Sequence, residues 1–263
     1  SLLSIFSRTQ IARSQKGQPV LFDVNLLRIG TFRNANIAAG IVSLGEFGLL
    51  FSLPLWLQNV LGYSAFGTGV ILLSLAVGSI LASGAGGALG AKRGSVFVVQ
   101  IGIFLELLGV TGIALIISPT TKVILIIIPL FIYGLGVGLA TAQLTGVALS
   151  QIPVEKSGQA SGMTSTTRQI GSALGIAILG TVLFASFGAT LRAAVPDQRI
   201  SSAIVNSAGG AIEALSRDPK NNYIVEQSKE ALTQGSRTSA YVASAFLLIG
   251  WFATRSLSRK ESR

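Results

Sequence analysis

The stretch SGMTSTTRQIGSALGIAILG, residues 161–180, decides how this sequence folds. Its second half is a run of Ile, Leu, Ala and Gly, which is typical of a helix that crosses a lipid bilayer. Arg168 nevertheless lies inside the stretch, with Thr and Ser residues on either side. A permanent cation within a membrane helix costs about 2.5–3.5 kcal/mol, so it needs a partner or a water-lined surface. The stretch therefore predicts a membrane protein and a functional position within it.

The composition of the whole chain also favours a membrane protein. Half of the 263 residues are hydrophobic and only 11% are charged, whereas soluble domains carry about 25% charged residues. The chain has no His and no Cys, which argues against thiol and imidazole catalysis and against most metal sites, so we expect no metal, no cofactor and no enzyme activity. The net charge of +10 is typical of the positive-inside bias of membrane proteins, and we expect no nucleic-acid partner.

Six apolar segments are each long enough to cross a bilayer core of about 30 Å as a helix. These runs are continuous, without the alternation over about ten residues that the strands of a β-barrel require. We therefore predict an all-α, polytopic bundle of six transmembrane helices. The predicted helices cover residues 35–60, 66–88, 95–118, 123–149, 160–187 and 238–256, the first five of them within 35–187.

The positive charges predict an orientation. Lys and Arg gather before the first helix, between the second and third, between the fourth and fifth, and after the sixth. Because cytoplasmic loops carry this excess, we predict a multi-pass protein of the cell (inner or plasma) membrane with both ends of this segment in the cytoplasm.

The remaining segments lie outside the membrane helices. Residues 1–34 mix apolar and basic positions and predict an interfacial lead-in, and residues 257–263 predict a cytoplasmic tail. Residues 188–237 carry mixed charge and local helical character, and predict a long extracytoplasmic loop, either a cap or a loosely ordered excursion. The opening SLLSIF resembles the end of an earlier hydrophobic segment, so we expect the chain to be the C-terminal part of a longer one.

Arg168 lies on a polar face of its predicted helix. Steps of three and four residues put Ser161, Thr164, Ser172 and Gly175 on the same side. This face suits a water-lined passage or a tight helix partner, and the guanidinium can hold an anionic group, a carboxylate or helix-end carbonyls. Alternatively, Arg168 only anchors the cytoplasmic end of the helix or pairs within this bundle.

Two acidic residues lie inside the predicted helices. Glu46 is about 18 Å along the first helix by the 1.5 Å rise per residue, near the bilayer centre, with Ser43 one turn away. A carboxyl group there can take up and release a proton, as a proton-coupled transporter requires. Alternatively, a protonated Glu46 only hydrogen-bonds a neighbouring helix. Glu106, among large apolar residues in FLELLG, is the second candidate for proton coupling.

Small and polar residues mark further faces. The second helix carries Ser74, Gly78, Ala82 and Gly86 at four-residue steps, and the fourth carries Gly134, Gly138, Thr141 and Thr145. Such faces let helix backbones approach closely. Two polar side chains, Tyr133 and Gln143, either line a cavity or form hydrogen bonds within the core. Near the outer end of the first helix, Gln58 and Asn59 are placed to reach an outer vestibule.

Three stretches resemble a known family: LPLWLQNVLGYSAFGTGV (53–70), GGALGAKRGS (86–95) and SGQASGMTSTTRQIGSALGIAILGTVL (157–183). They are similar to the last six helices of drug:proton antiporters of the major facilitator superfamily, in the fourteen-helix group (EmrB/QacA-like). Residues Gly87, Lys92, Arg93 and Gly94 resemble the second copy of the cytoplasmic-loop motif of that family. Ala91 stands where the strong copy has an acidic residue, which argues against a charge relay through this loop.

The resemblance implies half of a transporter, made of two inverted three-helix repeats beside a central cavity. The first and fourth helices would line the cavity, the second and fifth would form the moving interface, and the third and sixth would lie outermost. Glu46 would thus face the cavity, Glu106 would be peripheral, and Arg168 would lie where the two halves slide.

The implied function is the export of small amphipathic compounds in exchange for protons by alternating access. Its partners are the substrate, protons, the bilayer and an N-terminal half of the same chain. The alternatives are a facilitator for a metabolite or a lipid-like molecule, and a membrane scaffold that does not transport.

Overall fold

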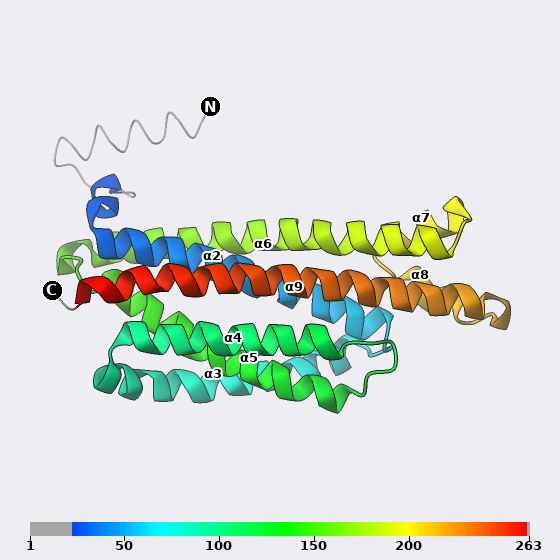
Figure 1. The fold of residues 1–263 in the computed structure, drawn as a ribbon, viewed down its shortest axis with the longest axis horizontal. Coiled ribbons are helices and arrows are strands. Elements are labelled where there is room, and N and C mark those ends of the chain that lie inside the picture. Colours follow the sequence, from blue (N-terminus) through cyan, green and yellow to red (C-terminus); the bar gives the residue numbers. More distant parts are fainter. Residues whose placement is uncertain (1–22, 262–263) are drawn as a thin grey trace.

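The computed structural model describes residues 23–261, almost all of them in helices (Figure 1). The predicted lead-in within 1–22, including the SLLSIF opening, and the last two residues of the predicted tail lie outside the described residues. In chain order the elements are η1 Val24–Arg28, α2 Gly30–Asn59, α3 Ala65–Arg93, α4 Ser95–Ile116, α5 Val123–Leu149, η2 Val154–Lys156, α6 Ser157–Ala194, α7 Gln198–Asn206, α8 Ala211–Leu215, η3 Pro219–Asn221 and α9 Asn222–Glu261.

The helices confirm the prediction of an all-α, polytopic membrane protein. In the described part of the chain, five helices are long and apolar enough to cross a bilayer: α2, α3, α4, α5 and the continuous stretch Val154–Ala194 that contains α6. The sixth predicted span, 238–256, lies inside α9, which is not among these five. Its place in the membrane remains a prediction.

The helices form two layers, with α2, α6 and α9 in one and α3, α4 and α5 in the other (Figure 1). The first helix, α2, packs mainly on α6 and α9, and the fourth, α5, packs mainly on α3 and α4. The two predicted repeats are α2, α3 and α4 in one triplet and α5, α6 and α9 in the other. The first helix of each triplet thus lies against the second and third helices of the other triplet, and α4 meets α9. This exchange is the packing that two inverted three-helix repeats would give, and it supports that prediction.

Glycines bring the backbones of paired helices into contact at two seams. A Cβ atom on Gly171 or Gly175 of α6 would overlap the main-chain carbonyls of Gly40 or Leu44 in α2. A Cβ atom on Gly134 or Gly138 of α5 would likewise overlap main-chain carbonyls of α3. Two of the small residues predicted to allow close approach in the fourth helix, Gly134 and Gly138, do so, because only glycine fits where two backbones touch.

The connection between α3 and α4 is shorter than predicted. Lys92 and Arg93 were expected in a loop but form the end of α3, and Gly94 alone separates the two helices. Gly94 has φ 86°, a conformation that side-chain-bearing residues rarely adopt. The motif is therefore a one-residue turn with two exposed basic side chains on its helical arm.

Residues 188–237 are more ordered than a loop. They hold the end of α6, the short helices α7 and α8, and the first turns of α9. The ring of Trp56, fully buried, donates from Nε1 to Thr233 Oγ1 at 2.9 Å. Arg237 donates to the carbonyl of Ile117 at 2.6 Å, at the end of α4. These contacts tie the early part of α9 to the ends of α2 and α4.

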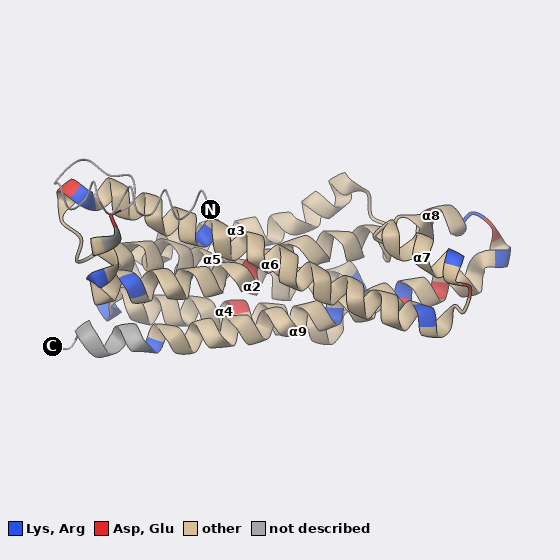
Figure 2. Cartoon of the chain, turned by 90° about the horizontal axis from the view of Figure 1, so that it is seen from above, with Lys and Arg blue, Asp and Glu red and all other residues tan. Residues whose placement is uncertain are grey.

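Basic residues lie at both ends of the bundle, as Figure 2 shows, and one charged contact lies at the end where α9 ends. There Lys156 Nζ lies 2.7 Å from Asp23 Oδ2, so the segment before α2 is joined to the connection before α6. Burial raises the pKa of Asp23, but the hydrogen bond and charge of Lys156 and the amides of Asn25 outweigh burial, so the net pKa lies below its ordinary value of 3.8.

Candidate functional site

The candidate site is a buried polar cluster where α2, α5 and α6 meet. Arg168 of α6 points its guanidinium at α2 and α5: Nη2 lies 3.7 Å from Glu46 Oε2 and donates to Thr141 Oγ1 at 3.2 Å, and Nε lies 3.4 Å from Ser43 Oγ. Glu46 is 4% exposed in its side chain and Arg168 is 26% exposed. The structure therefore joins Arg168 to Ser43 and Glu46, which were predicted on another helix, and the cation pairs within this bundle.

Glu46 keeps one acceptor without a partner. Its Oε1 is buried and has no hydrogen-bond partner in the part of the chain that the structure describes. A cavity of about 10 Å³ lies between Glu46, Arg168, Thr141 and neighbouring apolar side chains, which is about the space that one water molecule needs. The carboxyl group is thus buried beside a small cavity, whereas the side chain of Arg168 is partly exposed.

Tyr133 of α5 is fully buried and donates from its hydroxyl to the main-chain carbonyl of Glu46 at 3.2 Å. This bond crosses from α5 to α2 at the position of the acidic residue. Tyr133, predicted either to line a cavity or to bond within the core, therefore bonds within the core, and it fixes the backbone beneath the Glu46 side chain.

The resemblance implied that Glu106 is peripheral, but the structure places it in the interior of the bundle. It is 0% exposed, and neither carboxyl oxygen has a hydrogen-bond partner among the described residues. The seam between α4 and α5 is closed around it, because a Cβ on Gly136 would lie 2.7 Å from Glu106 Cγ. The carboxyl groups of Glu46 and Glu106 are close enough for their charges to interact, and Arg168 interacts with both. The inward direction comes from helix packing, which the sequence of α4 alone does not reveal.

The polar face of α6 is bonded mainly to its own helix. Thr164 Oγ1 donates to the carbonyl of Ala160 at 3.0 Å, and Ser172 Oγ donates to the carbonyl of Arg168 at 2.8 Å. These hydroxyls share the face of Arg168, as predicted, but both donate to main-chain carbonyls of α6 itself. Thr141, which accepts a hydrogen bond from the guanidinium of Arg168, was predicted only as a small residue of a packing face. Its role depends on a contact across 27 positions of sequence.

Other predicted polar residues lie away from the cluster. Gln143 packs against α3, where a Cβ on Gly90 would lie 2.8 Å from its Oε1. Of the motif residues, Gly87 is exposed within α3. The guanidinium carbon of Arg93 lies 5.6 Å from the centre of the Phe97 ring. Gly94 forms the turn itself. The structure therefore separates these residues into a packing contact and a turn.

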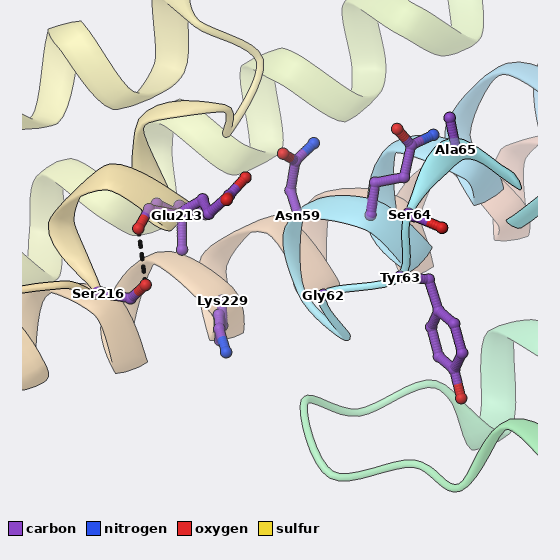
Figure 3. A pocket seen from close by; sticks show the side chains of 10 residues that line it. Asn59, Gly62, Tyr63, Ser64, Ala65, Glu213, Ser216 and Lys229 are labelled. Carbon is purple, nitrogen blue, oxygen red and sulfur yellow. Dashed lines mark hydrogen bonds between the residues drawn. The ribbon is translucent and has the colours of Figure 1, made fainter. Parts of the chain in front are cut away.

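Gln58 lines a different cavity, of about 500 Å³, beyond the end of α2 (Figure 3). Its walls come from the α2–α3 connection, α8 and α9, and include Asn59, Tyr63, Glu213 and Lys229. Asn59 closes one side by donating to the carbonyl of Ala208 at 3.3 Å. The prediction of an outer vestibule named Gln58 but missed Glu213 and Lys229, because they lie in the segment expected to be a loop.

Comparison with known proteins identifies the family to which this architecture corresponds. Residues 4–176 match the family model described as Major Facilitator Superfamily. The chain is 32% identical over 252 residues to the Multidrug resistance protein Stp of Mycobacterium tuberculosis, covering 88% of this chain and 46% of the relative. It is 26% identical over 244 residues to the Multidrug efflux pump LfrA of Mycolicibacterium smegmatis, covering 90% of this chain and 48% of the relative.

A third relative is the Tetracycline resistance determinant of Streptomyces rimosus, 28% identical over 189 residues that cover 70% of this chain and 52% of the relative. The chain thus spans about half the length of the curated relatives that it matches. What is similar is therefore about half of each of these proteins.

Proposed function

The chain belongs to the major facilitator superfamily, and from this premise we propose that it forms half of a proton-coupled exporter of small amphipathic compounds. The names of the relatives, which include multidrug resistance and efflux proteins, support export of such compounds. The other half would be an N-terminal bundle of the same protein, and both ends of this segment would lie in the cytoplasm.

The observation that carries the proposal is the pairing of Glu46 with Arg168 across the α2–α6 seam. Protonation of Glu46 neutralises its carboxylate, and the charge pair that holds α2 against α6 is then lost. Deprotonation restores the pair. A proton would therefore change the attraction between two helices that already meet backbone to backbone at Gly171 and Gly175, which is the kind of coupling that alternating access needs.

The exposed apolar surfaces of α3 and α6 support a partner bundle that packs against these two helices. In the apolar stretch of α3, only 22% of the residues are buried within the bundle, and large apolar residues such as Phe66, Leu73 and Ile80 are exposed. Ile170 and Leu174 of α6 are exposed as well. We propose that these two helices form the moving interface, with Arg168 at its inner edge.

The test is transport by the full-length protein in proteoliposomes under an imposed proton gradient. Glu46→Gln keeps the shape of the side chain but cannot ionise, so we expect proton-driven export to be lost while substrate exchange without a gradient persists. Glu155→Gln, an exposed acid in η2, is the matched control and should export like the wild type. Undiminished proton-driven export by the Glu46→Gln protein would remove Glu46 from the mechanism.

The direction of transport separates this proposal from its alternatives. An outwardly directed flux driven by protons moving inward fits an exporter, whereas accumulation of substrate inside would fit a facilitator-type importer of a metabolite. Absence of any substrate-dependent proton movement by the intact protein would favour a membrane scaffold.

A further inference from the structure

An apolar groove lies between α4 and α9, toward the end of the bundle where α9 ends. Its volume is about 270 Å³ and its lining consists of Phe97, Gln100, Ile101, Phe104 and Trp251. The rings of Phe104 and Trp251 lie 6.4 Å apart and form its two walls. Trp251 Nε1 donates to the main-chain carbonyl of Gln100 at 3.1 Å, so the ring is held across both helices and presents an apolar face.

Two arginines stand at the rim of this groove. The guanidinium carbon of Arg93 lies 5.6 Å from the centre of the Phe97 ring, and that of Arg255 lies 4.5 Å from the Trp251 ring and 5.5 Å from the Phe252 ring. Both side chains are exposed. Stacking on an aromatic face holds a guanidinium in place while the N–H groups at its edge still point outward, where they suit a phosphate.

We propose that this groove binds an anionic phospholipid of the surrounding bilayer. The phosphate lies between Arg93 and Arg255, and an acyl chain lies along Phe104 and Trp251. The occupant follows from the charge of the rim, the apolar lining and the exposure of the groove on the outside of the bundle, because a basic rim above an apolar slot matches a negatively charged headgroup above a hydrocarbon chain.

This site is separate from the cluster around Arg168. Phe104 and Leu108, four residues apart, are exposed on the outer face of α4, whereas Glu106, between them in sequence, points inward and is fully buried. The lipid site therefore does not depend on the transport proposal. A bound lipid would bridge α4 and α9, the last helices of the two triplets, and stabilise their contact.

The test uses Trp251 as a reporter of the groove. The chain contains only two Trp residues, and Trp56 is fully buried. In the full-length protein, with every other Trp replaced by Phe, fluorescence quenching by bromine-labelled phosphatidylglycerol and by bromine-labelled phosphatidylcholine gives the relative affinity of the two lipids at Trp251. We expect phosphatidylglycerol to be preferred by about fivefold for each arginine at the rim.

The double variant Arg93→Gln, Arg255→Gln should bind both lipids equally, while the double Lys variant, which keeps both charges, should retain most of the preference. Arg33→Gln removes an exposed arginine of α2 that does not line the groove and should behave like the parent protein.

Three results would each overturn the proposal. Equal quenching by the two lipids in the parent protein would show that the rim does not select an anion. A preference that survives loss of both arginines would place the selectivity elsewhere. Quenching by neither lipid, together with cross-linking between copies at introduced cysteines beside Trp251, would show that a second copy of the protein covers the groove.

Discussion

Two seams of this bundle each bury a glutamate, and the two glutamates differ in the polar groups that surround them. At the α2–α6 seam, Glu46 faces a cation, two hydroxyl groups near that cation and a cavity of about 10 Å³. At the α4–α5 seam, Glu106 is fully buried and its carboxyl oxygens have no partner among the described residues. The comparison teaches that the surroundings of a buried acid, rather than its presence, make it a candidate for coupling a proton to helix movement.

The largest expected effects come from substitutions that force apart the two helices packed at either seam. Gly171→Ala at the α2–α6 seam and Gly136→Ala at the α4–α5 seam would drive a Cβ into main-chain atoms, so each should destabilise the full-length protein by about 1–3 kcal/mol. Thermal unfolding in detergent measures the loss. If Gly136→Ala were neutral, the α4–α5 seam would be looser than the structure has it.

The matched controls are Gly162→Ala in α6 and Gly146→Ala in α5, where a Cβ would meet nothing within 4 Å. Alanine is the better helix former by about 0.5–1 kcal/mol, so these variants should be unchanged or more stable. A loss of stability at Gly162 would instead reveal a further helix packed on that face of α6, as a partner bundle requires.

A double-mutant cycle sharpens the contrast between the two acids. Removing the side chain of Arg168 leaves Glu46 buried without its cation, and we expect Arg168→Ala to destabilise the protein by about 2 kcal/mol. Glu46→Gln should recover part of this loss, because it removes the unpaired charge. Thermal unfolding of the two single variants and the double variant gives the coupling energy.

Glu106→Gln is the comparison within this cycle. Among the described residues Arg168 forms an ion pair with Glu46 and not with Glu106, although the charges of Arg168 and Glu106 interact, so the effect of Glu106→Gln should depend less on Arg168 than the effect of Glu46→Gln. A coupling between Arg168 and Glu106 as large as that between Arg168 and Glu46 would contradict the distinction between the two seams.

The smallest effect is expected outside the membrane helices, at the Asp23–Lys156 bridge. The pKa of Asp23 lies below its ordinary value of 3.8, so the charged form is favoured by folding. Its contribution is fully present above the unfolded pKa and is lost as the pH falls through the lower, folded pKa. Because Lys156 is 46% exposed, we expect at most about 1 kcal/mol.

The measurement is the thermal stability of the wild type, Asp23→Asn and Lys156→Gln between pH 7 and pH 3. The wild type should be the most stable at pH 7, and its advantage over both variants should shrink below about pH 4. An advantage that does not change with pH would mean that the bridge contributes through packing alone.

The prediction from sequence was most successful where composition carries the information. Continuous apolar runs predicted the membrane helices, because a chain in hydrocarbon must satisfy its backbone within each segment. It failed at Glu106, and for the segment 188–237 it gave local helical character without the contacts that order it. The direction of a side chain within an apolar helix depends on which neighbours pack there, and mixed charge does not distinguish a loop from a helix that leans on others.

The sequence by itself therefore determined that the chain is an all-α membrane protein and that Glu46 and Arg168 are exceptional among apolar neighbours. Only the tertiary structure decided that these two charges meet each other, that Thr141 joins them from α5, and that Glu106 is enclosed without a hydrogen-bond partner among the described residues. The physical reason is that charge and hydropathy are properties of each residue along the chain, whereas an ion pair or a sealed seam exists only when helices far apart in sequence are brought to within a few ångströms by backbone contact at glycines.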